Sequence, residues 1–376
     1  MKLKAAAFII SVLIFVSILI SGTIILLLPT FSSASSSNTA VQKQVNPNAQ
    51  VETSQVSVID VGEEEKVQPA APTTLLALGD VMLGRYVETL IEKNGNEYPF
   101  SNLQSLMHRY DVVLANLEGP IVEGASKTPD ESLRFSFRPW VTDILTANNI
   151  THTSLANNHL LDYGESGFEE TITHLSNSNI IPIGHPREIS EQYIVTDAIG
   201  DHQIIFIGIQ AVSSTSINEL TSLVKKVCIH GKLCVVTIHW GGEYGLRSNT
   251  TQQNLAHALI DSGADVIIGH HPHVVQEIEL YNNSLIYYSL GNTIFDQYFS
   301  KDTQEGLLVG IEVTEKNLDF MLYPIRSEKS RPRLMTNEES SIWFEQLSDR
   351  SPTVSAESIH KGSISLKLNR ECNCGN

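Results

Sequence analysis

The sequence has little cysteine, a deficit of positive charge and only one long apolar run. Four cysteines in 376 residues are too few for a fold held together by disulfides. Lysine and arginine number 25 against 42 acidic residues, a formal net charge of -17, which excludes the basic surface typical of a nucleic-acid partner. No repeat with a solenoid period is present. These absences favour a globular protein with about 300 residues in one large core or two smaller ones.

The apolar run extends from Ala5 to Leu28 and follows Lys2 and Lys4. About 20 apolar residues span a bilayer as a helix, and lysines favour the cytoplasmic side. We expect a single-pass cell-membrane protein whose C-terminal domain is extracytoplasmic. Cleavage of a signal peptide in the small-residue stretch 31–37 is the alternative.

Composition then divides the chain into four parts. Residues 1–30 form the cytoplasmic tip and transmembrane anchor, and residues 31–72, rich in Ser, Asn and Gln, form a flexible extracytoplasmic linker. Residues 73–335 form the main domain, and residues 336–376 a C-terminal helix and tail.

Strand-like and helical segments alternate in the main domain before hairpins take over. We expect strands at 75–78, 111–117, 150–155, 180–183, 235–238 and 265–268, with hairpins over 193–209, 274–290 and 307–324. We expect helices at 101–109, 141–148, 165–176, 251–262 and 340–347. This pattern predicts an α/β fold with a mixed sheet or two packed sheets flanked by helices.

Polar side chains follow the predicted strands at five points, where α/β folds place their sites. Taken alone, each of these residues can also have a purely structural role. For example, Asp80 can cap a helix, and His239 can be a core histidine. Together the carboxylates, amides and imidazoles suit a divalent metal such as Mn, Fe or Zn. The five segments are 79–85, 116–119, 157–164, 239–241 and 269–273.

These segments resemble the CapA-type capsule and poly-γ-glutamate synthesis family. The matching strings are Gly79-Asp80-x-Met82-Leu83-Gly84-Arg85, Asn116-Leu117-Glu118, Ala156-Asn157-Asn158-His159-x-x-Asp162-Tyr163-Gly164, His239-Trp240-Gly241-x-Glu243, Gly269-x-His271-Pro272-His273-Val274-x-Gln276 and Tyr288-Ser289-Leu290-Gly291-Asn292-x-Ile294-Phe295-Asp296. The resemblance implies a metallophosphoesterase-like β-sandwich flanked by helices, a four-layer αββα fold, behind an N-terminal transmembrane helix.

The resemblance also implies roles for particular residues. His159 would be the catalytic general acid, and the metal ligands would be Asp80, Glu118, Asn158, His239, His271 and His273. Two positions depart from the phosphoesterase pattern: Met82 replaces a histidine ligand, and Glu118 replaces a bridging aspartate. One ion and two ions both stay open, and His270 also can face the site.

Further residues are candidates for substrate contact or for orienting the ligands. Arg85 can bind a phosphate or carboxylate, or form a surface ion pair. Trp240 can line the cleft or pack in the core. Asp162, Asn292 and Asp296 can hold ligands in place, or cap turns.

Two functions are compatible with this sequence. One is a metal-dependent hydrolase or transferase acting on a phosphoester or on a bond of a cell-surface polymer. The other is a non-catalytic accessory that binds or tethers an anionic polymer such as poly-γ-glutamate, with membrane synthase or export subunits as partners. Cys228 and Cys234 form either a disulfide or two free thiols, and Cys372 and Cys374 stay unassigned.

Overall fold

The computed structural model describes residues 71–213, 215–229 and 231–368. The expected transmembrane anchor, the linker to residue 70 and the Cys372–Cys374 pair lie outside these residues. Within the described part of the chain, no helix is long and apolar enough to cross a membrane.

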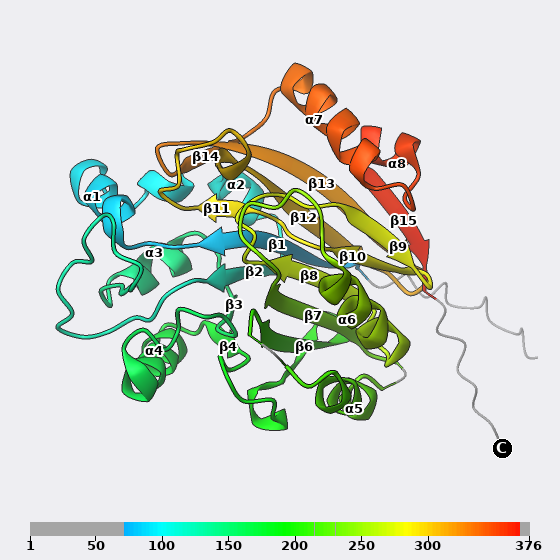
Figure 1. Ribbon diagram of the computed structural model, residues 1–376, viewed down its shortest axis with the longest axis horizontal. Coiled ribbons are helices and arrows are strands. Elements are labelled where there is room, and N and C mark those ends of the chain that lie inside the picture. Colours follow the sequence, from blue (N-terminus) through cyan, green and yellow to red (C-terminus); the bar gives the residue numbers. More distant parts are fainter. Residues whose placement is uncertain (1–70, 214, 230, 369–376) are drawn as a thin grey trace, which may run out of the picture. The chain divides into compact units, whose positions relative to one another are not determined.

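The strands form two mixed sheets (Figure 1). The order of the first, nine-stranded sheet is β14-β13-β12-β1-β2-β3-β4, with β11 paired to β1 and β15 to β13. Its strands are β1 (Thr73–Val81), β2 (Val112–Leu117), β3 (His152–Ser154), β4 (Ile181–Ile183), β11 (Asn292–Ile294), β12 (Glu305–Val313), β13 (Asn317–Glu328), β14 (Arg331–Leu334) and β15 (Ser363–Lys367).

The second sheet has six strands in the order β5-β6-β7-β8-β10-β9. They are β5 (Val195–Ile199), β6 (His202–Ala211), β7 (Leu233–Trp240), β8 (Val266–His270), β9 (Ile278–Tyr281) and β10 (Ser284–Tyr287). The helices are α1 (Arg85–Asn94), α2 (Gln104–Met107), α3 (Val141–Ala147), α4 (Gly164–Asn177), α5 (Ile217–Val227), α6 (Thr250–Asp261), α7 (Asn337–Arg350) and α8 (Ala356–His360).

Alternation along the central strands explains the layers. In β1, Leu75 and Ala77 join a core between the two sheets, whereas Leu76 and Leu78 join a second core with α1 to α4. In β7, odd-numbered Leu233 and Val235 join the inter-sheet core, and the even-numbered residues pack with α5 and α6. Because successive side chains of a strand point to opposite faces, both faces of these central strands are buried. The expected α/β fold with helix-flanked packed sheets is confirmed.

The predicted elements are mostly present, with some corrections. The helix expected at 101–109 is wrong in extent, because this segment holds only α2 after a short 3-10 turn at Tyr98–Phe100. The sequence did not predict α1, α5, β11 or β14. Residues expected as a C-terminal helix and tail also contribute α8 and β15, and β15 pairs with β13.

A disulfide joins Cys228, at the end of α5, to Cys234 in β7. It therefore resolves the two alternatives that the sequence left open for this pair.

Candidate functional site

The site lies where parallel strands of both sheets end. Register aligns Asp80 of β1 with Asn116 of β2, and His239 of β7 with His270 of β8. Parallel strands present their carboxyl ends at one edge of a sheet, so side chains far apart in the sequence gather there.

Glycines before Asp80 and His270 permit this close packing. A Cβ atom on Gly79 would lie 2.0 Å from the carbonyl oxygen of Gly291. A Cβ on Gly269 would lie 2.0 Å from the carbonyl oxygen of Tyr288. In the Gly-Asp and Gly-His strings, the glycine therefore allows close backbone contact, and the polar residue that follows it supplies the side chain of the site.

Asp80, Glu118 and His239 form a first group of potential metal ligands. Each is at most 1% exposed, and one donor atom from each lies within 4.8 Å of the others. Burial raises the pKa of Asp80, but hydrogen bonds and charge from His270 and His273 outweigh it and hold that pKa well below its usual range. Asp80 is therefore an anion at neutral pH.

Glu118 is the least satisfied member of this group. Among the described residues, neither of its carboxylate oxygens has a hydrogen-bond partner. Burial raises the pKa of Glu118 to about 8, although the charge of His273 opposes the shift. A buried carboxyl group without hydrogen bonds is costly, and a bound cation would neutralise it. These donors therefore fit a divalent metal ion.

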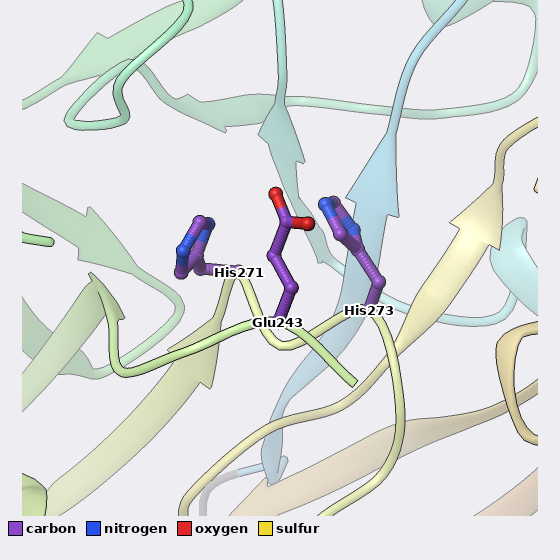
Figure 2. A group of neighbouring side chains, drawn as sticks. All are labelled: Glu243, His271 and His273. Carbon is purple, nitrogen blue, oxygen red and sulfur yellow. The ribbon is translucent and has the colours of Figure 1, made fainter. Parts of the chain in front are cut away.

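Glu243, His271 and His273 form a second group with donor atoms within 4.8 Å of one another. Figure 2 shows the Glu243 carboxylate between the two imidazole rings. His271 is 5% exposed, and within the described ranges its Nδ1 has no hydrogen-bond partner. Burial and the charge of His273 lower the pKa of His271 to about 4, so its ring is neutral and can coordinate a metal.

The two groups are in contact. Nε2 of His273 lies 3.6 Å from Oε1 of Glu118, and the rings of His239 and His271 have centroids 4.8 Å apart. Burial lowers the pKa of His273, but the charge of Glu118 and the contact with Asp80 more than offset this and raise it to about 9. The structure thus brings five of the six predicted ligands into one cluster, with Glu243 added.

The sixth predicted ligand, Asn158, lies at the edge of this cluster. Its Oδ1 is 2.8 Å from Nε2 of His239. Behind it, Nδ2 of Asn157 donates to Oδ1 of Asn116 at 3.0 Å, and Nδ2 of Asn116 donates to Oδ1 of Asp80 at 2.8 Å. This amide chain is buried and fixes the orientation of the Asp80 carboxylate.

His159 stands at the rim with its orientation fixed on two sides. Its Nδ1 lies 2.9 Å from Oδ2 of Asp162, and its ring stacks on Phe135 at a centroid distance of 4.0 Å. Its Nε2 lies 4.0 Å from Oε1 of Glu118. The nitrogen not held by Asp162 therefore faces the metal-ligand cluster, which is the position the predicted general acid requires.

The other candidates have defined partners. Oδ1 of Asn292 lies 3.0 Å from Nδ1 of His273, so Asn292 orients that ring. Arg85 forms an ion pair with Asp296. Trp240 is 1% exposed, packs in the core with α5 and α6, and donates Nε1 to the carbonyl of Tyr288; its substrate contact stays a prediction. Met82 is fully buried in the core beside α1 to α4.

No role was predicted from the sequence for Glu243, Asn116, Asn157 or Phe135. Glu243 had a visible signal, since it closes the His239-Trp240-Gly241-x-Glu243 string. Asn116 also had a visible signal, since it opens the Asn116-Leu117-Glu118 string. The stacking of Phe135 on His159 had none, because the long loop that carries Phe135 has no periodic pattern.

Comparisons with known proteins identify the family of this chain. The family model of the bacterial capsule synthesis protein PGA_cap matches residues 74–297, which include every residue of the cluster. The chain is 30% identical over 290 residues to the PGA biosynthesis protein CapA of Bacillus subtilis, covering 72% of this chain and 76% of that protein. It is 26% identical over 323 residues to the capsule biosynthesis protein CapA of Bacillus anthracis, covering 79% and 78%. Among solved structures, TT1561 of Thermus thermophilus has a TM-score of 0.37 at 10% identity, covering 65% of this chain and 99% of that one. The chain therefore belongs to the CapA-type family of capsule and poly-γ-glutamate synthesis proteins.

Proposed function

We propose that this chain is a membrane-anchored, extracytoplasmic protein that takes part in capsule or poly-γ-glutamate assembly. We further propose that it is a hydrolase or transferase that acts on a phosphoester or on a bond of the polymer. The printed names of the two Bacillus relatives, both biosynthesis proteins, support the pathway. The apolar run from Ala5 to Leu28 after two lysines supports the anchor and its orientation. The metallophosphoesterase-like part of the proposal rests on the site.

One observation carries the catalytic proposal. Glu118 is fully buried without a hydrogen bond among residues described, next to Asp80, His239 and His273. Contacts of Oε1 with the rings of His273 and His159, at 3.6 and 4.0 Å, offset only part of this burial, whereas metal binding would account for both its position and its neighbours.

The residues of the cluster define how such a site would work. Asp80, Glu118, His239, Glu243, His271 and His273, with Asn158 at the edge, would hold one or two Mn, Fe or Zn ions. A bound ion supplies Lewis-acid polarisation of the substrate and lowers the pKa of a water. His159 would donate a proton from Nε2 to the leaving group, because Asp162 holds Nδ1 and stabilises the imidazolium. Phe135 keeps the ring facing the cluster.

Metal content and activity of the full-length protein test this proposal together. We expect bound Mn, Fe or Zn by mass spectrometry, and hydrolysis of a generic phosphodiester or of γ-glutamyl oligomers. In the variants His271→Ala and Glu243→Gln, the affinity for the metal ion should fall by about 10- to 100-fold. The variant His159→Ala should still bind metal but should lose turnover. Glu357→Gln, an exposed change on α8, is the control. Unchanged turnover in His271→Ala and Asn158→Ala would refute catalysis at this site.

A non-catalytic accessory role is the second candidate, and Met82 favours it. The position where phosphoesterases carry a histidine ligand is here an apolar side chain buried in the core. A relative from Mycobacterium tuberculosis, 24% identical over 284 residues, is named a probable polyglutamine synthesis accessory protein. Co-sedimentation with poly-γ-glutamate, lost in the metal-site variants and without turnover, would support this role. Absence of binding to both the polymer and the membrane synthase subunits would eliminate it.

A further inference from the structure

Arg85, the arginine that the sequence suggests for substrate binding, is already engaged. It is 8% exposed, forms an ion pair with Asp296, and donates Nη1 to the carbonyl of Ser132 at 3.2 Å. Its guanidinium also lies 4.9 Å from the ring centroid of Phe135 and 5.3 Å from that of Phe295. Because its charge is compensated inside the protein, Arg85 has little capacity for a second anion.

Arg134 differs in each of these respects. It is exposed, and its Nε donates to the carbonyl oxygen of Asp162 at 2.6 Å. Its guanidinium stacks over Tyr163 at 4.1 Å from the ring centroid. Over residues 71–213, 215–229 and 231–368, its two terminal nitrogens have no hydrogen-bond or ion-pair partner. The guanidinium is therefore held in place while its two outer donors stay free.

The neighbours of Arg134 place it beside the general acid. The next residue, Phe135, stacks on the His159 ring, and its backbone N–H donates to Oδ2 of Asp162 at 2.7 Å. That same oxygen lies 2.9 Å from Nδ1 of His159. Asp162 thus contacts His159 through its side chain and Arg134 through its carbonyl oxygen, so one residue links the arginine to the general acid.

We propose that Arg134 is the substrate-binding arginine of this site and that it holds an anionic oxygen group, a carboxylate or a phosphate, of the substrate. Guanidinium donors match both groups in bidentate geometry. The stacking on Tyr163 and the bond to Asp162 restrict the side chain before binding, which reduces the entropy lost on binding. In a chain of net charge -17, a cation next to Asp162 that has no ion pair within the described structure also attracts an anionic substrate. This inference rests on the proposed function for the reaction, but its binding step is independent of turnover.

Anion affinity of the full-length protein in detergent tests the inference. Inorganic phosphate and glutarate are titrated calorimetrically, with and without added Mn²⁺. We expect at least one probe to bind, and Arg134→Gln to weaken that probe at least tenfold. Arg134→Lys should recover part of the phosphate affinity and little of the glutarate affinity, because lysine lacks the planar fork. The probe that binds more tightly identifies the anionic group.

Arg331→Gln is the matched control, since Arg331 is likewise exposed and lies over a tyrosine ring, 5.4 Å from the centroid of Tyr98, on β14. It should bind both probes as the wild type does. Failure of both probes to bind the wild type, or wild-type affinity in Arg134→Gln, would overturn the inference.

The inference and the proposed catalysis can fail separately. If anion affinity depends on Arg134 but no substrate is turned over, the inference stands and the hydrolase proposal fails. If metal-site variants abolish turnover while Arg134→Gln leaves anion affinity unchanged, the hydrolase proposal stands and the inference fails.

Discussion

Glu118 destabilises the metal-free protein wherever it is ionised. Its oxygens lack hydrogen bonds within the described structure, and its nearest acidic neighbour, Asp80, is already an anion. Proton uptake by Glu118 relieves part of this cost. His273 relieves another part, since its raised pKa keeps it cationic between the two carboxyl groups.

The pKa shifts predict that the metal-free protein loses stability as the pH rises from 7 to 9. The pKa of Glu118 is about 8 in the folded protein against an ordinary 4.5, and that of His273 is about 9 against 6.5. In this range the folded state binds more protons than the unfolded state, so the free energy of unfolding falls with pH. We expect a lower Tm, by about 2–4 °C for each ~1 kcal/mol lost, in differential scanning calorimetry with a chelator present.

His271 has the opposite effect on the pH dependence of stability. Its folded pKa of about 4 lies below the ordinary 6.5, so the contribution of His271 to the free energy of unfolding falls as the pH drops from 6.5 towards 4, whereas that of Glu118 rises over the same range. Glu118→Gln should flatten the alkaline decline, whereas Glu315→Gln, an exposed change in the turn after β12, should leave it as in the wild type. An alkaline decline of the same size in Glu118→Gln would show that the buried carboxyl group is not its cause.

At the scale of elements, the contact between β1 and the segment before β11 positions Asp80. The backbone N–H of Asp80 donates to the carbonyl of Gly291 at 3.0 Å, and Gly79 makes room for it. The variant Gly79→Ala would put a methyl group 2.0 Å from that carbonyl oxygen. We expect it to separate the two segments and to cost about 1–3 kcal/mol, the usual range for overpacking, measured by urea unfolding.

Gly242→Ala is the matched control for this change. An added Cβ at Gly242 meets no heavy atom within 4 Å in the described part of the chain, so the unfolding midpoint of this variant should stay within error of the wild type. A wild-type midpoint in Gly79→Ala would mean that β1 and its neighbour tolerate a wider spacing.

The sequence predicts the presence of β1, β7 and β8, because short apolar runs are local signals, but each strand continues two or three residues beyond its predicted end. Strand alternation also separates His239, which faces the cluster, from Trp240, which faces the helices. It does not predict β11, a three-residue strand whose pairing with β1 spans more than 200 residues. The role of Glu243 is equally non-local, since its loop is joined to Pro272 by the bond from Tyr244 N–H to the Pro272 carbonyl at 2.8 Å.

On the scale of the whole molecule, the metal-ligand cluster joins the two sheets. Asp80 and Glu118 extend from strands of the first sheet, whereas His239, His271 and His273 extend from the second. Without a cation, the buried carboxyl and imidazole groups must balance one another across this junction. A ligand bound by donors from both sheets would instead resist their separation, which is the motion that unfolding requires.

Metal binding should therefore raise the Tm of the protein after treatment with a chelator. A ligand at 100 times its Kd adds about 2.7 kcal/mol to the free energy of unfolding, and we expect Mn²⁺ or Zn²⁺ to give a shift of several degrees. The double variant Asp80→Ala, His271→Ala removes one donor from each sheet and should lose the shift. Glu357→Gln should retain it, because a surface carboxylate on α8 joins nothing across the junction. An equal shift in the double variant would mean that the ion binds elsewhere on this acidic protein.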